Sequence, residues 1–391
     1  MTEPTAGCTV ISVAPPSAER LASIDVVRGL AMVLMALDHA RTYLSDFSLD
    51  PLDLQRTTLA LFLTRWATHF SAPAFFFLAG VSARRLSLTL APPDLTRFLL
   101  LRGCWLIVLE LTLVYFVWTF KLPGTGPPIL GVIWALGWSM VALAGFVRLP
   151  LAWAGAISVA VIAGHHVMDS IAAAALGPWS TAWSVLHEKG LTPVGKVVYP
   201  LVPWIAVMAL GYVFGGAYDW APPRRRLFFQ RLGLGLIALF LALRLTGVYG
   251  DPQPWTLHPT MVLTVLSFLN VQKYPPSLAF LALTLGLALL ALAVAERPRA
   301  RLGRALQTFG RVPLFFYVAH LLLAHLFAGV VAVSLGFDLA LLAKDPIAAG
   351  WGFGLPVAYT AWLSIVVLLY PACRRFADVK RRRAGSWLQY C

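Results

Sequence analysis

The sequence has little charge for its length: 12% of its 391 residues are charged and only 17 are acidic, whereas 59% are hydrophobic. An ordinary soluble domain is about one quarter charged. A chain with so much apolar surface cannot bury it in a single aqueous core. The composition therefore argues against a soluble globular protein.

Cysteine is also scarce, and the cysteines form no pattern with a chemical meaning. The four are Cys8, Cys104, Cys373 and Cys391, with no Cys-x-x-Cys pair and no metal-ligand spacing. Neither a disulfide framework nor a zinc site is predicted. The sequence also lacks a glycine-rich phosphate loop, a Gly-x-Ser-x-Gly nucleophile motif and a nucleic-acid-binding module, so the motifs of soluble enzymes are missing.

Hydrophobic runs recur from one end of the chain to the other. Each has about 20 residues, the length that a helix needs to cross a hydrocarbon core of about 30 Å. Backbone groups without partners cost several kcal/mol each in lipid, so such runs become helices. We therefore predict an all-α, polytopic transmembrane bundle of about ten spans. They are expected at residues 24–44, 62–82, 98–119, 128–147, 151–171, 197–216, 227–248, 276–295, 312–334 and 352–373.

The basic residues predict the orientation of these spans. The net charge of +14 comes from short Lys and Arg clusters between the hydrophobic runs, a pattern that indicates membrane topology rather than nucleic-acid binding. Most of these clusters share one side if both chain ends are cytoplasmic, which predicts an N-in, C-in arrangement. Residues 257–275 are apolar but short and end at Pro275 and Pro276. They are expected to form a re-entrant or half helix, or an eleventh span.

Three regions are expected along the chain. Residues 1–20 are predicted to be a disordered cytoplasmic segment; Thr5 to Cys8 resemble a lipoprotein cleavage site, but no basic and apolar segment of adequate length precedes them. Residues 21–375 are expected to form one transmembrane domain. Residues 376–391 are expected to be a basic cytoplasmic tail suited to anionic lipid.

The first predicted span carries Arg28 and His39, which are eleven positions apart. Eleven residues make roughly three helical turns, so both side chains point the same way, about 16 Å apart along the axis. A pantetheine arm has a comparable length. One hypothesis is that Arg28 meets the phosphates of an acyl-CoA while His39 waits at the thioester. The alternative is that Arg28 pairs with Asp25 and His39 bonds a neighbouring helix.

Two further residues are candidates for proton transfer. His69 precedes Pro73, which can loosen the helix and free backbone groups; the alternative is a packing or hydrogen-bonding role. Asp38 is adjacent to His39 and points about 100° away on a regular helix. It is therefore expected to meet either His69 or Arg41.

The second half of the chain supplies candidates for ligand binding. Asn270, Lys273 and Tyr274 precede two prolines at an outer-facing turn, where they could bind the acceptor or stabilise an oxyanion; a rigid capped turn is the alternative. Arg311 and His320 are expected on one helix that starts at the cytoplasmic side. Arg311 is a candidate contact for the nucleotide end of the donor or a topological charge, and His320 a candidate substrate contact.

Two other polar groups have structural interpretations. His165, His166 and Asp169 lie close in sequence, but a metal needs three or four ligands and no further ones are nearby. No metal site is predicted. Glu110 is expected to pair with Arg102 within the bundle.

Several stretches along the chain carry a resemblance to a known family. They are Arg20 to Asp25 with Arg28 and Gly29, Ser71 to Gly80, Tyr199 and Pro200 with Pro203 and Trp204, Phe268 to Ser277, and Gly310 to Tyr317 with His320. In these stretches the chain resembles the bacterial membrane proteins of domain-of-unknown-function family 1624, which are grouped with the catalytic domain of heparan-α-glucosaminide N-acetyltransferase. Arg28 and His39 also match the arginine, ten residues, histidine pattern of the acyltransferase-3 proteins.

The resemblance implies acyl transfer from a cytoplasmic donor to an acceptor outside. In the glucosaminide acetyltransferases the key histidine lies in the loop after the first span, whereas residues 45–61 contain no histidine here. His39 falls where those enzymes carry an asparagine. A catalytic role for His39 therefore follows from the acyltransferase-3 match.

The expected function is an integral-membrane acyltransferase of the bacterial cytoplasmic (inner) membrane. It would move acetyl or another short acyl group from acyl-CoA, a co-substrate and not a permanently bound cofactor, to an extracytoplasmic sugar or glycan. His39 would act as general base or as an acyl relay. A small-molecule, lipid or glycan transporter, or flippase, is the alternative, and a non-catalytic scaffold is a third. The expected partners are membrane lipid and the two substrates, with no nucleic acid; a homodimer is left open.

Overall fold

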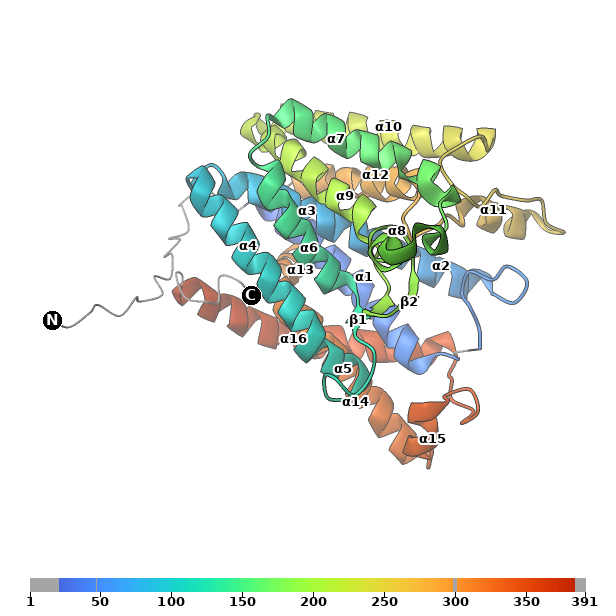
Figure 1. Ribbon diagram of the computed structural model, residues 1–391. Helices are drawn as coiled ribbons and strands as arrows, with labels where there is room; N and C mark the ends of the chain where they lie inside the picture. Colours follow the sequence, from blue (N-terminus) through green and yellow to red (C-terminus); the bar gives the residue numbers. More distant parts are fainter. Residues whose placement is uncertain (1–20, 47, 298–300, 384–391) are drawn as a thin grey trace.

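The computed structural model describes residues 21–46, 48–297 and 301–383. The expected disordered segment at residues 1–20 lies outside this part of the chain. The described residues form a helical bundle with one small sheet (Figure 1). The principal helices are α1 (Ala22–Leu44), α2 (Leu59–Ala67), α3 (Ser71–Leu86), α4 (Pro92–Leu109), α5 (Tyr115–Thr119), α6 (Val132–Phe146), α7 (Leu151–Gly164), α8 (Ser180–His187), α9 (Leu201–Phe214), α10 (Pro222–Thr246), α11 (Met261–Leu269), α12 (Leu278–Ala295), α13 (Arg301–Arg311), α14 (Pro313–Ser334), α15 (Leu339–Lys344) and α16 (Leu355–Arg382).

Short helical segments of tighter or wider geometry extend these helices. They are the 3₁₀ turns η1 (Thr68–Phe70), η3 (His165–Ser170), η4 (Ala173–Trp179) and η5 (Gly215–Asp219), and the π-helical turn η2 (Glu110–Val114) between α4 and α5. Each of the ten predicted spans contains a helix. Among the described residues, seven helices are long and apolar enough to cross a membrane, and α6 is a shorter apolar helix. The number of crossings and their orientation stay predictions.

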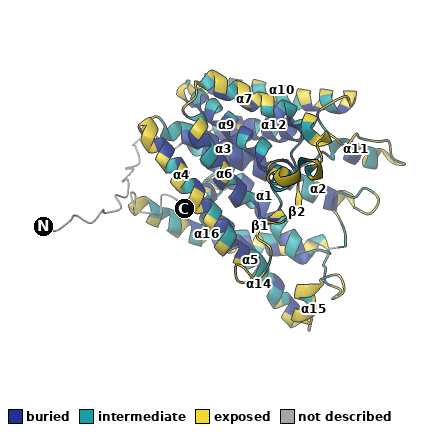
Figure 2. Ribbon diagram, viewed as in Figure 1, coloured by how far each residue is buried: buried dark blue, intermediate teal, exposed yellow. Residues whose placement is uncertain are grey.

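Helix α1 lies in the middle of the bundle, where it contacts α3, α12, α13, α14 and α16. Its small residues Ala31, Ala36 and Ala40 are completely buried, and Gly29 allows α13 to approach: a Cβ on Gly29 would lie 1.8 Å from the carbonyl oxygen of Leu306. Small residues at such contacts let helix backbones pack closely in membrane bundles. Figure 2 shows the resulting contrast between the buried inner helices and the exposed faces of the outer ones.

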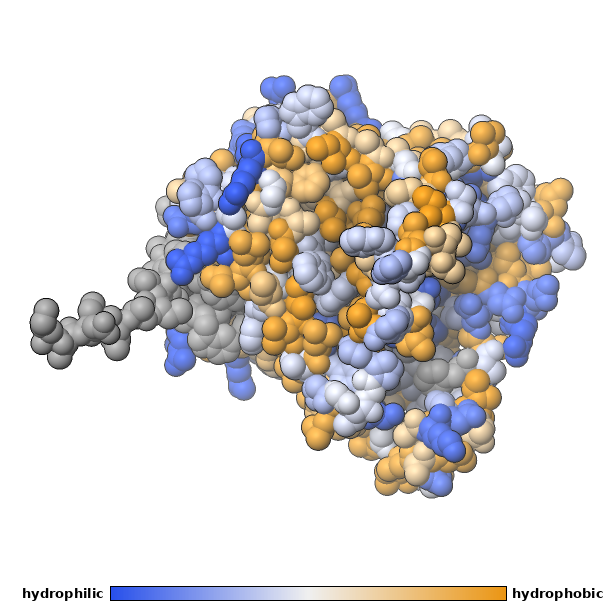
Figure 3. All heavy atoms as spheres, in the orientation of Figure 1, coloured by the Kyte–Doolittle hydropathy of each residue, from blue (hydrophilic) through white to orange (hydrophobic). Residues whose placement is uncertain are grey.

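The outer faces of the bundle are apolar, as expected for lipid contact. Helix α4 exposes Leu101, Trp105 and Val108, and Figure 3 shows hydrophobic residues across the middle of one face of the molecule with hydrophilic residues largely at its margins. Helix α16 runs antiparallel to α1, because Ser45 after α1 pairs with Phe353 before α16. The start of α1 and the end of α16 therefore lie at the same end of the bundle.

Three features differ in detail from the sequence prediction. A three-stranded sheet of order β1-β3-β2 joins β1 (Ile129–Leu130), β2 (Gly190–Thr192) and β3 (Gly195–Val197). β1 runs parallel and β2 antiparallel to β3. The predicted spans 128–147 and 197–216 therefore begin in strands, and their helices begin only at Val132 and Leu201. Residues 257–275 contain the nine-residue α11, which at 1.5 Å per residue is too short to cross a bilayer. A short helix here fits the expected half helix and not an eleventh span.

The second difference concerns Glu110, whose partner is not Arg102. Its carboxylate accepts hydrogen bonds from the backbone N–H groups of Ile133 and Trp134, at 3.1 and 3.3 Å, and so caps the N-terminus of α6. The approach requires Gly131, because a Cβ there would lie 2.3 Å from Glu110 Oε1. A carboxylate at a helix N-terminus satisfies free N–H groups and opposes the helix dipole.

The third difference concerns Arg311, which does not share a helix with His320. Arg311 ends α13, and α14 begins at Pro313. Proline has no N–H to donate and favours the first turn of a helix, so the chain bends at Val312. At the other end of the chain, α16 continues to Arg382 and so runs through the predicted boundary at residue 375; residues 384–391 of the predicted tail lie outside the described part.

Candidate active site

A cavity of about 650 Å³ lies beside the second half of α1. It is bounded by α1, by the α2–η1–α3 segment, by the loop after α1 and by the loop between α11 and α12. Six of the nine candidate residues line it: Asp38, His39, His69, Asn270, Lys273 and Tyr274. The fold thus brings together residues that lie more than 200 positions apart in the sequence.

His39 reaches the cavity from α1 and has a second histidine behind it. Nδ1 of His39 and Nε2 of His320 are 2.7 Å apart, and the two rings are nearly parallel, with an interplanar angle of 9°. His320 is completely buried and does not line the cavity. Its expected role as a substrate contact therefore does not suit its position. Trp118 packs edge-on against the His39 ring, with centroids 5.0 Å apart.

Asp38 is held by two arginines. Its carboxylate pairs with Arg41 at 3.1 Å, one of the two partners expected from the sequence, and with Arg65 of α2. The second expected partner, His69, does not bond to it. Asp38 and Arg65 both line the cavity, so the ion pair forms part of the cavity wall.

His69 lies on η1, where the α2–α3 helix tightens. Pro73 cannot donate a hydrogen bond to the carbonyl four residues earlier, which belongs to His69, and this explains the local departure from α geometry. The side chain is only 2% exposed, and neither ring nitrogen has a hydrogen-bond partner among the described residues. Buried polar groups without partners are rare and call for an explanation such as a catalytic role.

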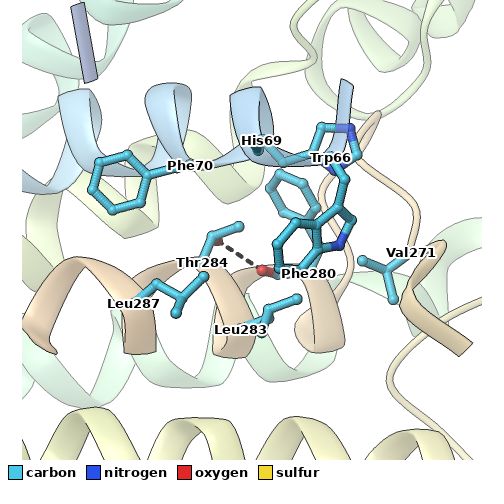
Figure 4. A pocket seen from close by; sticks show the side chains of 9 residues that line it. Trp66, His69, Phe70, Val271, Phe280, Leu283, Thr284 and Leu287 are labelled. Carbon is cyan, nitrogen blue, oxygen red and sulfur yellow. Dashed lines mark hydrogen bonds between the residues drawn. The ribbon is translucent and has the colours of Figure 1, made fainter. Parts of the chain in front are cut away.

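His69 also borders a second, much smaller cavity of about 30 Å³, which residues of α2, η1 and α12 line (Figure 4). Trp66 lies next to it, and Phe280 of α12 packs against the His69 ring with centroids 5.4 Å apart. The Thr284 hydroxyl in this cavity donates to the carbonyl of Phe280 at 2.7 Å. The aromatic and aliphatic walls on this side hold the imidazole in place without bonding to it.

The loop that carries Lys273 and Tyr274 is tied down by a buried arginine and a carboxylate. Arg244 of α10 donates to the carbonyls of Ser267, Phe268 and Asn270 at 2.8 to 3.3 Å. Asp251 accepts from the Gln272 backbone N–H at 2.9 Å and from the Ser277 hydroxyl at 2.6 Å. The turn expected from the two prolines is therefore rigid and also faces the cavity.

Asn270 joins this loop to the one after α1. It follows the last residue of α11, and its Nδ2 donates to the carbonyl of Leu52 at 3.2 Å. Leu52, Asp50 and Asp53 line the cavity too. The loop after the first span, in which no histidine occurs, thus forms one wall of the cavity that His39 enters.

Two lysines lie close to the ring of Tyr274. The Nζ atoms of Lys189 and Lys273 are 4.8 and 5.2 Å from the centre of its ring, and its hydroxyl donates to that of Tyr199 at 3.4 Å. Burial by itself raises the pKa of Tyr274, but Lys273 and Arg65 outweigh burial and lower this pKa to about 8. Burial lowers the pKa of Lys273. The cavity therefore favours negative charge at Tyr274.

This electrostatic setting predicts that one tyrosine ionises near pH 8. Because folding lowers the pKa of Tyr274 from an ordinary value of 10.0 to about 8, its phenolate adds stability as pH rises from about 8 to 10, and that stability is lost as pH falls through 8. Ultraviolet difference absorbance of tyrosinate should show a single early transition that Tyr274→Phe removes and Lys273→Met moves to higher pH. A transition that survives Tyr274→Phe would contradict this assignment.

The two residues expected to bind the donor lie away from this cavity. Arg28 donates to Asp25 and to the Gly310 carbonyl, both at 3.2 Å, and to the Ser82 hydroxyl at 2.7 Å. Arg311 approaches the other oxygen of Asp25 at 3.9 Å. The pairing of Arg28 with Asp25, the alternative considered above, is therefore present, and both arginines converge on one carboxylate near the start of α1.

Arg65, Trp118 and Arg244 take part in these contacts, although no sequence pattern had marked them as candidates. Arg65 and Arg244 are charges inside apolar segments, which is the usual signal of a functional or structural site in a membrane protein. His187 joins His166 and Asp169, because Asp169 accepts from both His166 and His187, at 2.6 and 2.7 Å. No group of three or more metal-coordinating side chains with suitable geometry occurs in residues 21–383 as far as they are described.

The family model of the heparan-α-glucosaminide N-acetyltransferase catalytic domain matches residues 20–243. The chain belongs to this family. No curated protein matches the chain. The family is one of membrane acetyltransferases, and the match covers α1 to most of α10, including His39, His69 and the Asp38 ion pair. Lys273, Tyr274 and His320 lie beyond the matched residues.

Proposed function

We propose that this protein transfers an acetyl group from cytoplasmic acetyl-CoA to an amine or hydroxyl of an extracytoplasmic sugar, with His39 as the central catalytic residue. The observation that carries the proposal is the position of His39: in a chain of an acetyltransferase family, it lies at the wall of the cavity that the other candidate residues line. The loop after α1 also lines this cavity and contains no histidine, and His39 reaches the same cavity from α1. This supports His39 as the residue that replaces a loop histidine.

Direct transfer needs one general base. Nε2 of His39 takes a proton from the acceptor as its nitrogen or oxygen attacks the acetyl carbonyl. The tetrahedral intermediate then expels the CoA thiolate, the carbon–sulfur bond breaks, and the thiolate takes the proton back from His39. The products are the acetylated acceptor and CoA, and His39 returns to its starting state.

A relay through His39 uses the same atoms in two steps. Nε2 attacks the acetyl carbonyl, the CoA thiolate leaves, and an acetyl-imidazole forms. The acceptor then attacks this acetyl group, His39 is released, and the acceptor's proton is finally transferred to the thiolate. A relay suits a membrane enzyme, because the acetyl group can pass from a donor on one side to an acceptor on the other.

Two neighbouring groups suit the charge that develops on the carbonyl oxygen. His69 has ring nitrogens without partners, one of which can donate a hydrogen bond, and Lys273 brings an ammonium group to the same cavity. Donors placed where negative charge develops stabilise the transition state in a site of low dielectric. We assign His69 and Lys273 to this role and Asn270 and Tyr274 to the acceptor.

The donor's phosphates are assigned to Arg28 and Arg311. Arg28 lies eleven residues before His39 on a continuous helix, a rise of about 16 Å, which matches the reach of a pantetheine arm. Both arginines contact Asp25, and a diphosphate would compete with that carboxylate for the guanidinium groups. Arginine suits this because its planar fork can bind phosphate through two hydrogen bonds.

The test uses purified protein, labelled acetyl-CoA and a panel of amino-sugar glycosides. We expect acetylated product from the wild-type protein and weaker acetyl-CoA binding by Arg28→Ala, whereas Arg381→Ala, an exposed arginine near the end of α16, should bind as the wild type does. Ping-pong kinetics with a labelled acetyl-enzyme would select the relay. If the wild type neither binds acetyl-CoA nor acetylates any sugar, the enzyme proposal is wrong and a transporter becomes the better explanation.

A further inference from the structure

The contact between His39 and His320 fixes which nitrogen of each ring carries hydrogen. Nδ1 of His320 lies 2.8 Å from the backbone carbonyl of Phe316. A carbonyl oxygen only accepts hydrogen bonds, so this Nδ1 carries the hydrogen. In a neutral imidazole the other nitrogen is then an acceptor, and Nε2 of His320 accepts from Nδ1–H of His39 at 2.7 Å.

The consequence for His39 is a single available lone pair. With its hydrogen on Nδ1, neutral His39 has an unprotonated Nε2, and no described residue forms a hydrogen bond to that atom. Since Nδ1 faces the buried His320 and His39 lines the cavity, Nε2 is the nitrogen that a substrate can reach. With the hydrogen of His39 on Nε2 instead, the lone pair of its Nδ1 would face the lone pair of His320 Nε2. If the hydrogen of His320 then moved to Nε2, its Nδ1 lone pair would face the Phe316 carbonyl oxygen.

The packing keeps this arrangement in place. His320 has no exposed surface and packs against the rings of Phe316 and Tyr317, with centroids at 5.2 and 5.7 Å. Its carbonyl partner is one turn earlier on the same helix α14, so the acceptor cannot move away from it. Trp118 packs edge-on against the His39 ring. Burial and the bond to the Phe316 carbonyl keep the His320 ring in this orientation.

We propose that His320 is a positioning residue that holds His39 in the tautomer with Nε2 as its reactive atom. The inference rests on the proposed function and deepens it. His320 does for His39 what the aspartate of a serine-protease triad does for its histidine, which is to set the tautomer and accept from the imidazolium that forms. A neutral imidazole replaces the carboxylate here. In both proposed mechanisms Nε2 gains and then loses the proton or acetyl group, while Nδ1–H stays bonded to His320.

Two substitutions separate this role from simple packing. His320→Phe keeps a ring in the stack but removes the acceptor, and we expect kcat to fall about 100-fold or more with the KM for acetyl-CoA within about twofold of wild type. His320→Gln places an amide oxygen near the position of Nε2 and should restore most of the loss. A His320→Phe protein with wild-type kcat, or a His320→Gln protein as poor as His320→Phe, would overturn the proposal.

A spectroscopic measurement tests the tautomer without any turnover. In protein labelled with nitrogen-15 histidine, the His39 resonances, assigned by comparison with His39→Ala, should report protonated Nδ1 and unprotonated Nε2. In His320→Phe a share of His39 should change to the other tautomer. Protonated Nε2 in the wild type would refute the positioning role of His320 even if the protein transfers acetyl groups. If the wild type has the expected tautomer but no transferase activity, the proposed function is wrong and the positioning role of His320 is retained.

Discussion

Replacing His39 with alanine is expected to lower acetyl transfer at least about a thousandfold while the protein stays folded. The substitution removes the only ring nitrogen that we assign as base or nucleophile, and removal of such a group from a catalytic set costs about three to four orders of magnitude. The KM for acetyl-CoA should change little, because Arg28 and Arg311 are assigned to the donor's phosphates. The measurement is steady-state transfer of labelled acetyl to an amino sugar.

The matched control for this substitution is His258→Ala. His258 lies in the loop before α11, bonds to Thr256, and is not among the residues that line the cavity. Its replacement should leave kcat and KM unchanged. If His39→Ala keeps more than about one tenth of wild-type kcat, then His39 is neither base nor relay, and His69 would become the first candidate.

Replacing Asp38 with alanine is expected to cost about 3 kcal/mol of stability. Asp38 is the shared partner of Arg41 and Arg65, and its side chain is only 16% exposed. Removing one member of a largely buried ion pair leaves charge without compensation and costs about 3–5 kcal/mol; exposure to the cavity favours the lower end. Thermal unfolding in detergent should show the loss as a markedly lower midpoint.

An exposed ion pair provides the comparison. Asp378 and Arg381 of α16 pair at 3.0 Å with side chains 48% and 73% exposed, and exposed pairs contribute about 0–1 kcal/mol. Asp378→Ala should therefore hardly change the unfolding midpoint. Equal effects of Asp38→Ala and Asp378→Ala would show that the cavity-wall ion pair does not hold α1 to α2.

The sequence was informative where a signal is local. The length of the hydrophobic runs identified the helical segments. Arg28 and His39 lie in one such run, and both are on the continuous helix α1. Local spacing also offered Asp25 as a partner for Arg28 and Arg41 as a partner for Asp38, and both pairs occur. Helical contacts three and four residues apart depend on helix geometry alone, so a sequence suffices to list them.

Contacts between distant segments could not be predicted in this way. His320 is 281 positions from His39 and Arg65 is 27 positions from Asp38; each meets its partner only because of how the helices pack. Glu110 likewise reaches the N-terminus of α6, 23 positions further along the chain, only because of how α4, η2 and α6 pack. The short strands β1, β2 and β3 have two or three residues each, too few for an alternating pattern to distinguish them from loop.

We propose that acetyl passes from a donor on one side of the membrane to a sugar on the other through His39. The most direct test is transfer in sealed proteoliposomes that contain an amino sugar, with labelled acetyl-CoA supplied only outside. We expect labelled, acetylated sugar inside vesicles with wild-type protein and at least about a thousandfold less with His39→Ala. Transfer only when donor and sugar share one compartment, or equal transfer by the two proteins, would contradict it.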